Sequence, residues 1–279
     1  MTEQIDAHQH YWEPARGDYD WMPMDDKVLA RRYGPADLAP HLDRHGIART
    51  VLVQAAATVE ETEYMLGIAD ATPSVAAVVG WVDFERPEHR AVLERLAGHP
   101  TFRGVRPMIQ DIPDDDWMLR DDVQWAYAAL AELDLTFDAL GFPRHLANFH
   151  TILTRYPEMR AVVDHCMKPQ IRDHGAETFR HWADGMAAIA RDTTAFCKFS
   201  ALVTETEGGW TVEDLRPYAE HVFEVFGPDR VMWGSDWPVC QLAASYDAWR
   251  EAAEALTAGL TAAECAQVYG GTAARFYRL

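Results

Sequence analysis

Two histidines separated by a single residue, His8 and His10, lie in the segment Asp6-Ala7-His8-Gln9-His10 near the start of the chain. We predict this segment to be a strand, and residues two apart in a strand point to the same side. Two converging imidazoles can bind a metal ion or contact an anionic substrate. Two histidines with this spacing also occur in proteins where they have no function. The position of His8 and His10 at the end of the first predicted strand favours a functional site.

Two further residues with reactive side chains close predicted strands much later in the chain. His165 ends the apolar run Val162-Val163-Asp164-His165, and Asp236 follows Trp233-Gly234-Ser235. A carboxylate near imidazoles can accept a proton from water, so Asp236 is a candidate general base and His165 a candidate catalytic partner. Two structural alternatives remain open: a core histidine bonded to backbone, and an aspartate that caps a turn. We expect Asp164 to point outward and to stabilise a neighbouring loop.

Three basic side chains are candidates for contact with a substrate. Lys198 lies in the apolar segment Phe196-Cys197-Lys198-Phe199-Ser200, and Arg106 ends another apolar run. A charge inside a protein core must be paired or must serve a ligand. For Lys198, a structural ion pair with Asp138 or Asp236 is the alternative. Lys168 either positions a loop or reaches a substrate hydroxyl.

Aromatic side chains gather at the ends of predicted strands and in two long irregular segments, Glu13–Pro35 and Ile109–Arg120. Long loops that follow strand ends are where substrate-covering segments belong. Aromatic rings stack on the C–H faces of sugars, so Trp21 and Trp237 are candidates for substrate binding. Core contacts that close the loops are the equally open alternative for each of these residues.

Short apolar runs alternate with longer amphipathic stretches along the whole chain. This alternation predicts an α/β fold, a single-domain (β/α)8 TIM barrel over residues 1–279, with an extra C-terminal helix at Thr261–Tyr277. A doubly wound open sheet is the competing architecture, but it usually has a glycine-rich turn after its first strand, where this chain has His-Tyr-Trp. The eight predicted strands are Gln4–Trp12, Thr50–Ala56, Val75–Phe84, Phe102–Met108, Leu135–Phe142, Arg160–Lys168, Ala195–Leu202 and Arg230–Trp237.

Composition excludes some classes of partner. The 279 residues include 25 basic and 44 acidic side chains, a formal charge of −19, and no basic run, which argues against a nucleic-acid partner. No apolar stretch is long enough to span a bilayer, so we expect no membrane partner. The four cysteines have no C-x-x-C spacing, which favours reduced thiols and a cytoplasmic location. The oligomeric state cannot be read from the sequence.

A first-strand H-x-H, a sixth-strand histidine and an eighth-strand aspartate together resemble the amidohydrolase superfamily. Within it, the chain is similar to the amidohydrolase-2 branch and to its group of sugar lactonases and 2-pyrone-4,6-dicarboxylate lactonases. The resemblance spans the chain and implies a hydrolase that opens a sugar lactone such as L-fuconolactone or L-rhamnonolactone. The segments that carry it are Asp6–Trp12, Phe102–Arg106, Asp164–Pro169, Trp233–Pro238 and Tyr269–Tyr277.

The chain departs from this family pattern at several positions. The fifth strand reads Phe137-Asp138-Ala139-Leu140, without the histidine of binuclear members, and the fourth strand lacks their bridging lysine. We therefore expect no two-metal site. Cys166-Met167 replace the usual Leu-Gly, which can alter the pocket floor, and Thr272 replaces the usual Asn, where we expect an effect on helix packing alone.

The resemblance implies a mechanism in which Asp236 activates a water molecule for attack on the lactone carbonyl. His8, His10 and His165, with Asp236, can hold one divalent ion, for which zinc is the predicted metal. A metal-free version fits the same residues, with His165 and a cation, Lys198 or Arg106, polarising the carbonyl.

Two other functions remain open at this stage. One is metal-dependent decarboxylation of an aromatic acid on the same barrel, which relatives in this branch perform with similar residues. The other is a non-catalytic barrel that binds a carbohydrate, in which Asp236 would contribute to affinity alone. The endings Trp-Gly-Ser-Asp-Trp-Pro and Asp164-His165-x-x-Lys168-Pro169 favour the lactonase.

Overall fold

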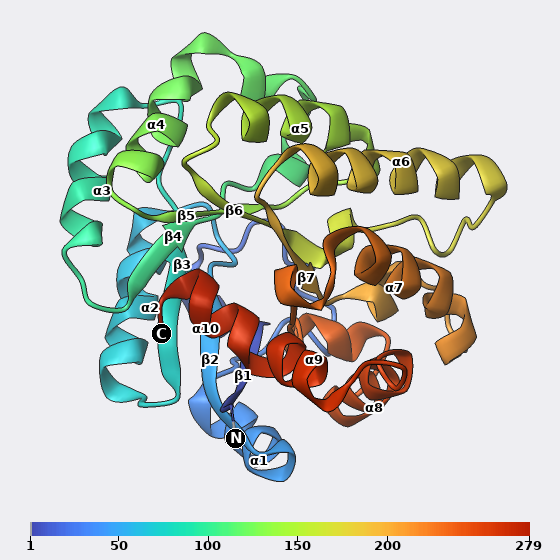
Figure 1. The fold of residues 1–279 in the computed structure, drawn as a ribbon. Helices are drawn as coiled ribbons and strands as arrows, with labels where there is room; N and C mark the ends of the chain where they lie inside the picture. Colours follow the sequence, from blue (N-terminus) through green and yellow to red (C-terminus); the bar gives the residue numbers. More distant parts are fainter. Residues whose placement is uncertain (1) are drawn as a thin grey trace.

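The computed structural model describes residues 2–279. Its eight parallel strands pair in sequence order, and a bridge between Gln9 and Trp237 joins the last strand to the first. The sheet therefore closes into a barrel with helices around it, which confirms the predicted (β/α)8 fold (Figure 1). The strands are β1 (Gln4–Gln9), β2 (Ile47–Val53), β3 (Val75–Gly80), β4 (Phe102–Val105), β5 (Thr136–Ala139), β6 (Arg160–Val163), β7 (Phe196–Phe199) and β8 (Val231–Trp233).

Ten α-helices surround or cap this barrel within residues 2–279. None of them combines the length and the apolar character that a bilayer crossing requires. They are α1 (Pro35–His45), α2 (Val59–Ala71), α3 (Arg90–Ala97), α4 (Gln124–Glu132), α5 (Leu146–Arg155), α6 (Ala176–Asp192), α7 (Val212–Phe226), α8 (Tyr246–Leu256), α9 (Ala262–Ala266) and α10 (Thr272–Tyr277).

All eight predicted strands exist, but each ends earlier than its apolar run. The largest difference is in β6, which ends at Val163, whereas the run that we predicted to be a strand continues to Lys168. Buried turns at the barrel mouth are as apolar as buried strands, so composition alone cannot separate the two. Several candidate site residues, among them His10, His165 and Asp236, lie in the segments that directly follow the strands, whereas His8 and Lys198 lie within β1 and β7.

The predicted C-terminal helix is present as three consecutive pieces: α9, a π-helical segment at Gln267–Gly271, and α10. These pieces lie across the end of the barrel where the strands begin (Figure 1). Ala273, Phe276 and Tyr277 of α10 pack in one buried cluster with apolar side chains of β1, β2, β3, β6 and β8. The C-terminal helix therefore closes the barrel at the end opposite to the predicted site.

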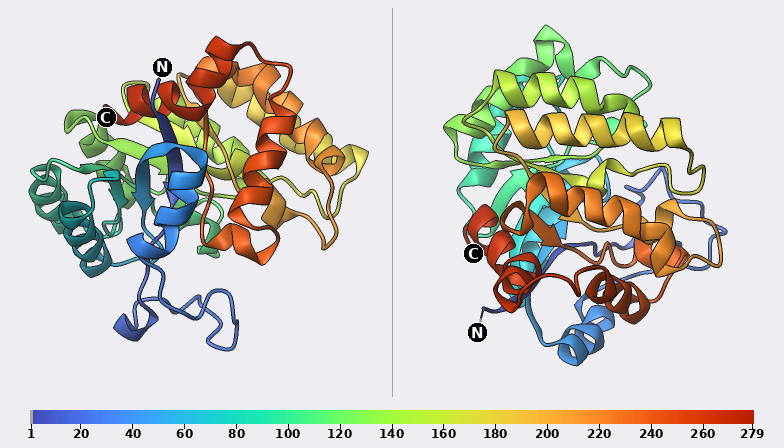
Figure 2. Two further views of the ribbon diagram at one scale, coloured as in Figure 1. Left: turned by 90° about the horizontal axis from the view of Figure 1, so that it is seen from below. Right: turned by 45° about the vertical axis from the view of Figure 1, so that its right-hand side comes forward.

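The two long loops lie at the other end of the barrel. Figure 2 shows the segment 13–34 extending from the end opposite to both chain termini. Trp12 anchors it, since its indole Nε1 donates to the carbonyls of Leu29 at 3.1 Å and Arg31 at 2.9 Å. Trp21 Nε1 donates to the Ala55 carbonyl at 2.6 Å, which ties the tip of the loop to the end of β2.

An N-cap without a reciprocal capping box begins α2. Thr58 Oγ1 accepts from the Glu61 amide at 3.0 Å, as expected for an N-cap. The Glu61 carboxylate, however, accepts from the amides of Ala55 at 3.0 Å and Ala56 at 2.7 Å instead of returning to Thr58. Glu61 is fully buried there and fixes the turn between β2 and α2.

Candidate active site

Four side chains from three strand ends converge at the barrel mouth. His8 Nε2 and His10 Nε2 lie 3.2 Å apart, and Asp236 Oδ1 lies 3.6 Å from the first and 3.3 Å from the second. His165 Nε2 is 3.9 Å from the same Asp236 oxygen. All four side chains are buried. The structure thus brings together the three histidines and the aspartate that the sequence singles out.

The closure of the barrel positions His8, His10 and Asp236. The Asp236 amide donates to the His8 carbonyl at 2.8 Å, and the His10 amide donates to the Trp237 carbonyl at 2.7 Å. Asp236 has a φ of 54°, a left-handed conformation that turns its carboxylate toward the imidazoles. Gly234 allows the close approach of the two strands, since a Cβ at this position would lie 2.7 Å from His8 Cβ.

A left-handed turn positions His165 and Lys168. The φ angles of His165, Cys166, Met167 and Lys168 are 54°, 50°, 58° and 46°, and none of the four is glycine. This conformation costs roughly 1–2 kcal/mol per residue, so neighbouring contacts must hold it. Trp182 Nε1 donates to the Cys166 carbonyl at 2.8 Å, and the Lys168 amide donates to the His165 carbonyl at 2.8 Å. The prediction of a strand through these residues is therefore wrong. Met167 has a left-handed backbone conformation, which glycine adopts more easily than other residues.

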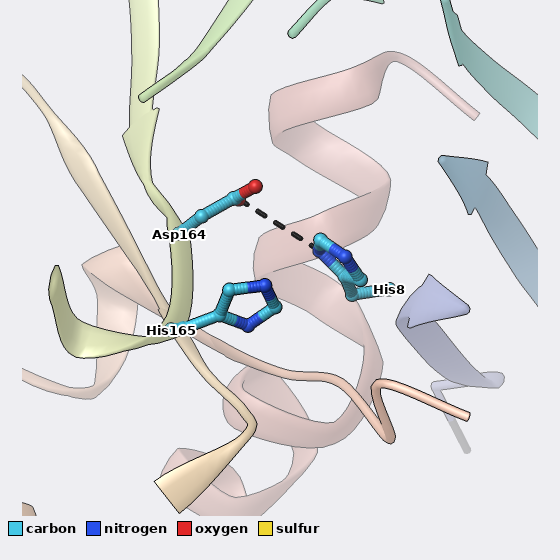
Figure 3. Close-up of side chains that lie close together, drawn as sticks. All are labelled: His8, Asp164 and His165. Atoms are coloured by element: carbon cyan, nitrogen blue, oxygen red, sulfur yellow. Dashed lines mark ion pairs between the residues drawn. The ribbon is translucent and has the colours of Figure 1, made fainter. Parts of the chain in front are cut away.

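Asp164 does not point outward as predicted. It is fully buried and points into the barrel. Val162 packs in the apolar cluster inside the barrel and Asp164 follows it by two residues, so strand alternation places both on the same side. The left-handed turn that begins at His165 then brings the His165 ring to the site as well. Its Oδ1 lies 3.8 Å from His8 Nδ1, and Figure 3 shows this pair beside His165. Its Oδ2 accepts from Arg106 Nη1 at 3.4 Å.

Asp6 joins β1 to the segment after β8 and to α8. Its Oδ1 accepts from the amides of His8 at 3.2 Å and Ser235 at 2.8 Å, and its Oδ2 accepts from the Tyr246 hydroxyl at 3.0 Å. Burial raises the pKa of Asp6 to about 6. Asp6 thus clamps β1 to the segment after β8 and to α8 on the outer side of the barrel. A register shift in β1 between Asp6 and Gln9 interrupts the strand alternation, so spacing alone did not assign this role.

Lys198 and Trp237 do not lie at the surface of the site. Lys198 is fully buried and pairs with Asp138 Oδ2 at 2.5 Å and Asp164 Oδ1 at 3.0 Å. Lys198 therefore forms the structural ion pair with Asp138 that is the alternative to substrate contact. Its second carboxylate partner is Asp164, not Asp236. Trp237 is 1% exposed and packs edge-on against aromatic rings, including that of Tyr33. The placement of both side chains argues against the substrate contacts predicted for them.

A cavity of about 320 Å³ opens above the converging residues, and His10, His165 and Asp236 line it while His8 lies beneath them. This volume is in the range of small-molecule sites. Arg106, Lys168 and Trp21, which we predicted to contact a substrate, are among its lining residues, and Trp21 is 40% exposed. The complete wall consists of His10, Trp12, Trp21, Leu29, Ala55, Arg106, Met108, Gln110, Asp111, Leu140, His165, Lys168, Asp236, Val239 and Leu242.

Burial keeps the imidazoles of the site neutral. It lowers the pKa of His8 well below its ordinary value, and the nearby Lys198 ammonium lowers it further. Burial also lowers the pKa of His165 well below its usual range, with Lys168 as the next cause, and it lowers the pKa of His10. Neutral imidazoles can act as metal ligands or as hydrogen-bond donors and acceptors, so both versions of the mechanism stay chemically accessible.

The spacing of the ligand atoms fits one metal ion. Around a zinc ion with bonds of roughly 2.0–2.1 Å, tetrahedral ligand atoms lie roughly 3.3 Å apart. The three separations among His8 Nε2, His10 Nε2 and Asp236 Oδ1 are 3.2, 3.3 and 3.6 Å. His10 Nδ1 lies 2.7 Å from the Val53 carbonyl, the type of outer contact that orients a ligating histidine. These residues therefore form a possible metal site.

A family model described as amidohydrolase matches residues 5–279. The chain belongs to the amidohydrolase family. This amidohydrolase is 42% identical to an L-fucono-1,5-lactonase of Burkholderia ambifaria, over 100% of this chain and 97% of that protein. It is 36% identical to an L-fucono-1,5-lactonase of Burkholderia multivorans, over 99% of this chain and 96% of that protein.

Solved structures of an amidohydrolase from Burkholderia multivorans have the same fold. A crystal form with bound HEPES superposes with a TM-score of 0.93 at 35% identity, and a form with bound zinc superposes with a TM-score of 0.92 at 35% identity. Each comparison covers 99% of both chains. The family and the barrel therefore rest on full-length matches in sequence and in structure.

Proposed function

We propose that this amidohydrolase hydrolyses a sugar lactone to the open sugar acid, with L-fuconolactone and L-rhamnonolactone as the first candidates. The convergence of the Asp236 carboxylate with three imidazoles, of which those of His10 and His165 line a small-molecule cavity, carries the proposal. The names of the two full-length relatives support the same reaction and point to a deoxy sugar.

The cavity wall suits a ring that is polar on one side and apolar on the other. Gln110, Asp111 and Lys168 offer hydrogen-bonding groups for ring hydroxyls. Leu29 and Leu242, with other apolar side chains of the wall, face the cavity without polar groups. A deoxyhexonolactone presents both kinds of surface, several hydroxyls and one methyl group.

Asp236 is the proposed general base. Its carboxylate lines the cavity, so a water molecule above it can give up a proton while its oxygen attacks the lactone carbonyl carbon. The bond between that carbon and the ring oxygen then breaks, and Asp236 returns the proton to the departing alkoxide. His165 is the proposed partner that stabilises the charge on the carbonyl oxygen, with Arg106 and Lys168 supplying positive charge nearby.

We further propose zinc as the metal of this site when one is bound, held by His8, His10 and Asp236 with His165 beside them. The donor set of imidazole and carboxylate suits zinc, and the related crystal form with bound zinc supports this choice. A bound ion would polarise the lactone carbonyl and lower the pKa of a coordinated water molecule.

A substrate screen tests the proposed reaction. Opening of a lactone releases a proton, so a pH-indicator assay over a panel of aldonolactones should show turnover, with deoxyhexonolactones among the fastest. The matched comparison is a spectroscopic panel of hydroxybenzoates, which reports decarboxylation. A response from the hydroxybenzoates alone would refute the lactonase proposal.

The variant Asp236→Asn tests the role of the base. We expect its turnover to fall by roughly 10²–10⁴-fold, while binding of the sugar acid measured by calorimetry stays within a few-fold of the wild type. Asp192→Asn is the control, because Asp192 is a carboxylate outside the barrel that pairs with Arg191 and His150. Wild-type turnover in Asp236→Asn would remove this residue from the mechanism.

A further inference from the structure

Lys198 makes two hydrogen bonds and one further ion pair inside the barrel. Its ammonium nitrogen donates to Asp138 Oδ2 at 2.5 Å and to His8 Nδ1 at 3.0 Å, and it pairs with Asp164 Oδ1 at 3.0 Å. The side chain is fully buried. An ammonium group has N–H donors and no acceptor, so Lys198 can only donate to His8 Nδ1.

This contact decides which nitrogen of His8 carries the hydrogen. A neutral imidazole has one donor and one acceptor nitrogen. Since Lys198 can only donate, His8 Nδ1 accepts and Nε2 carries the hydrogen. Arg106 Nη1 also lies near Nε2, at 3.3 Å, but that contact is longer, and Arg106 has acceptors in Asp164 Oδ2 and the Gln54 carbonyl.

His10 has the opposite arrangement. Its Nδ1 lies 2.7 Å from the Val53 carbonyl, which can only accept, so Nδ1 carries the hydrogen and Nε2 presents a lone pair to the centre. The Nε2 atoms of His8 and His10 are 3.2 Å apart. The pair thus forms a donor and an acceptor that face the same point.

We propose that Lys198 is a positioning residue that fixes His8 as an N–H donor toward His10 Nε2 and so opposes metal binding at His8 Nε2. This inference rests on the proposed lactonase function. The His8 N–H group holds the His10 ring, which lines the cavity beside Asp236, in one orientation. A metal ion binds an imidazole nitrogen that carries no hydrogen, so an ion at His8 Nε2 must displace the Lys198 hydrogen bond. The ammonium charge beside the ring also repels a cation.

The tautomer can be measured without substrate. Nitrogen NMR of the metal-free protein with ¹⁵N-labelled histidine distinguishes protonated from unprotonated ring nitrogens, and the spectrum of His8→Gln assigns the His8 signals. We expect His8 Nδ1 without hydrogen and Nε2 with it, and the reverse for His10. A hydrogen on His8 Nδ1 would overturn the proposal, whatever reaction the enzyme catalyses.

Removal of the ammonium group provides the second test. Lys198→Met is combined with Asp138→Asn to limit the unpaired charge left in the barrel, and Asp138→Asn alone, which keeps Lys198, is the matched control. In the double variant we expect zinc affinity, measured by competition with a chromophoric chelator, to rise by about tenfold or more over the control. We expect kcat of the metal-free double variant to fall by about tenfold or more with KM nearly unchanged, because the His10 ring beside Asp236 loses its fixed orientation.

An unchanged zinc affinity in the folded double variant would overturn the proposal. If Lys198 had only a structural role, the double variant would lose stability but keep the wild-type His8 tautomer and the zinc affinity of the control. The measurements therefore distinguish a positioning role from a structural one. If the double variant does not fold, the NMR measurement on the wild-type protein still decides the question.

Discussion

The close approach of β1 to the segment after β8 makes Gly234 a sensitive position. A Cβ at residue 234 would lie 2.7 Å from His8 Cβ and 3.0 Å from the His8 amide nitrogen. Carbon atoms in contact prefer roughly 3.5–4.0 Å, so Gly234→Ala must move one of the two segments by about 1 Å. Because Asp236 and His8 lie on these segments, the movement separates the proposed base from an imidazole of the centre.

The expected loss of activity follows from that displacement. A misplacement of about 1 Å costs on the order of 10²-fold in rate, or about 2.7 kcal/mol of transition-state stabilisation. We expect kcat/KM of Gly234→Ala for the best lactone to fall by about this factor. Overpacking should also lower the free energy of unfolding by about 1–3 kcal/mol.

Gly185→Ala is the matched control, because its Cβ would meet Leu146 Cδ1 at the same 2.7 Å, but between α6 and α5. Steady-state kinetics with a pH indicator and urea denaturation are measured for both variants. Gly185→Ala should lose stability and keep its kcat/KM within about twofold, because it displaces no residue of the site. A wild-type kcat/KM in Gly234→Ala, or equal losses of kcat/KM in the two variants, would refute the reasoning.

Three further predictions concern stability and the cavity rim. Burial raises the pKa of Glu61 from its ordinary 4.5 to about 7, so its contribution to stability is complete below pH 4.5 and is lost as the pH rises through 7. In urea titrations, the unfolding free energy of the wild type relative to Glu61→Gln should therefore decrease by about 3 kcal/mol between pH 4.5 and pH 8. Trp21→Phe removes the bond to the Ala55 carbonyl, and KM should rise about fivefold with kcat nearly unchanged, since a hydrogen bond contributes about 1 kcal/mol. Gly67→Ala should stabilise the protein by about 0.5–1 kcal/mol in the same titrations, because it is an exposed helix position with open space around its Cβ.

Each of these predictions has an outcome that contradicts it. A wild-type advantage over Glu61→Gln that grows with pH would mean that the amides of Ala55 and Ala56 outweigh the cost of burying the carboxylate. An unchanged KM in Trp21→Phe would show that the loop tip does not contribute to binding. A loss of stability in Gly67→Ala would contradict the open surroundings of that residue.

The sequence predicted the parts of the site that follow from strand periodicity and strand position. The pairing of His8 with His10 follows from the two-residue repeat of a strand, and His165 and Asp236 follow from their places at the ends of apolar runs. Closure of the barrel brings the ends of these strands together at one rim. Each of these residues is recognised from its own short segment, and the fold class alone then predicts that they lie close together.

The parts that the sequence did not predict depend on long-range contacts or on turns without a sequence signal. The left-handed turn from His165 to Lys168 contains no glycine, so its apolar composition indicated a strand. The prediction assigned the inward direction to His165 by alternation, whereas alternation from Val162 places Asp164 inside and the turn places His165. The partners of Lys198 lie 60 and 34 positions away, and only the folded barrel selects Asp138 and Asp164 from the other carboxylates.

The bridge that joins Gln9 to Trp237 has a consequence for synthesis of the protein in the cell. During translation, β1 emerges first, and its outer edge has no partner until more than two hundred further residues have been made. A free strand edge is a template for pairing with other chains, and unfinished α/β proteins expose such edges together with apolar surface. Yield of this protein should therefore be sensitive to translation speed and to chaperones that shield nascent chains.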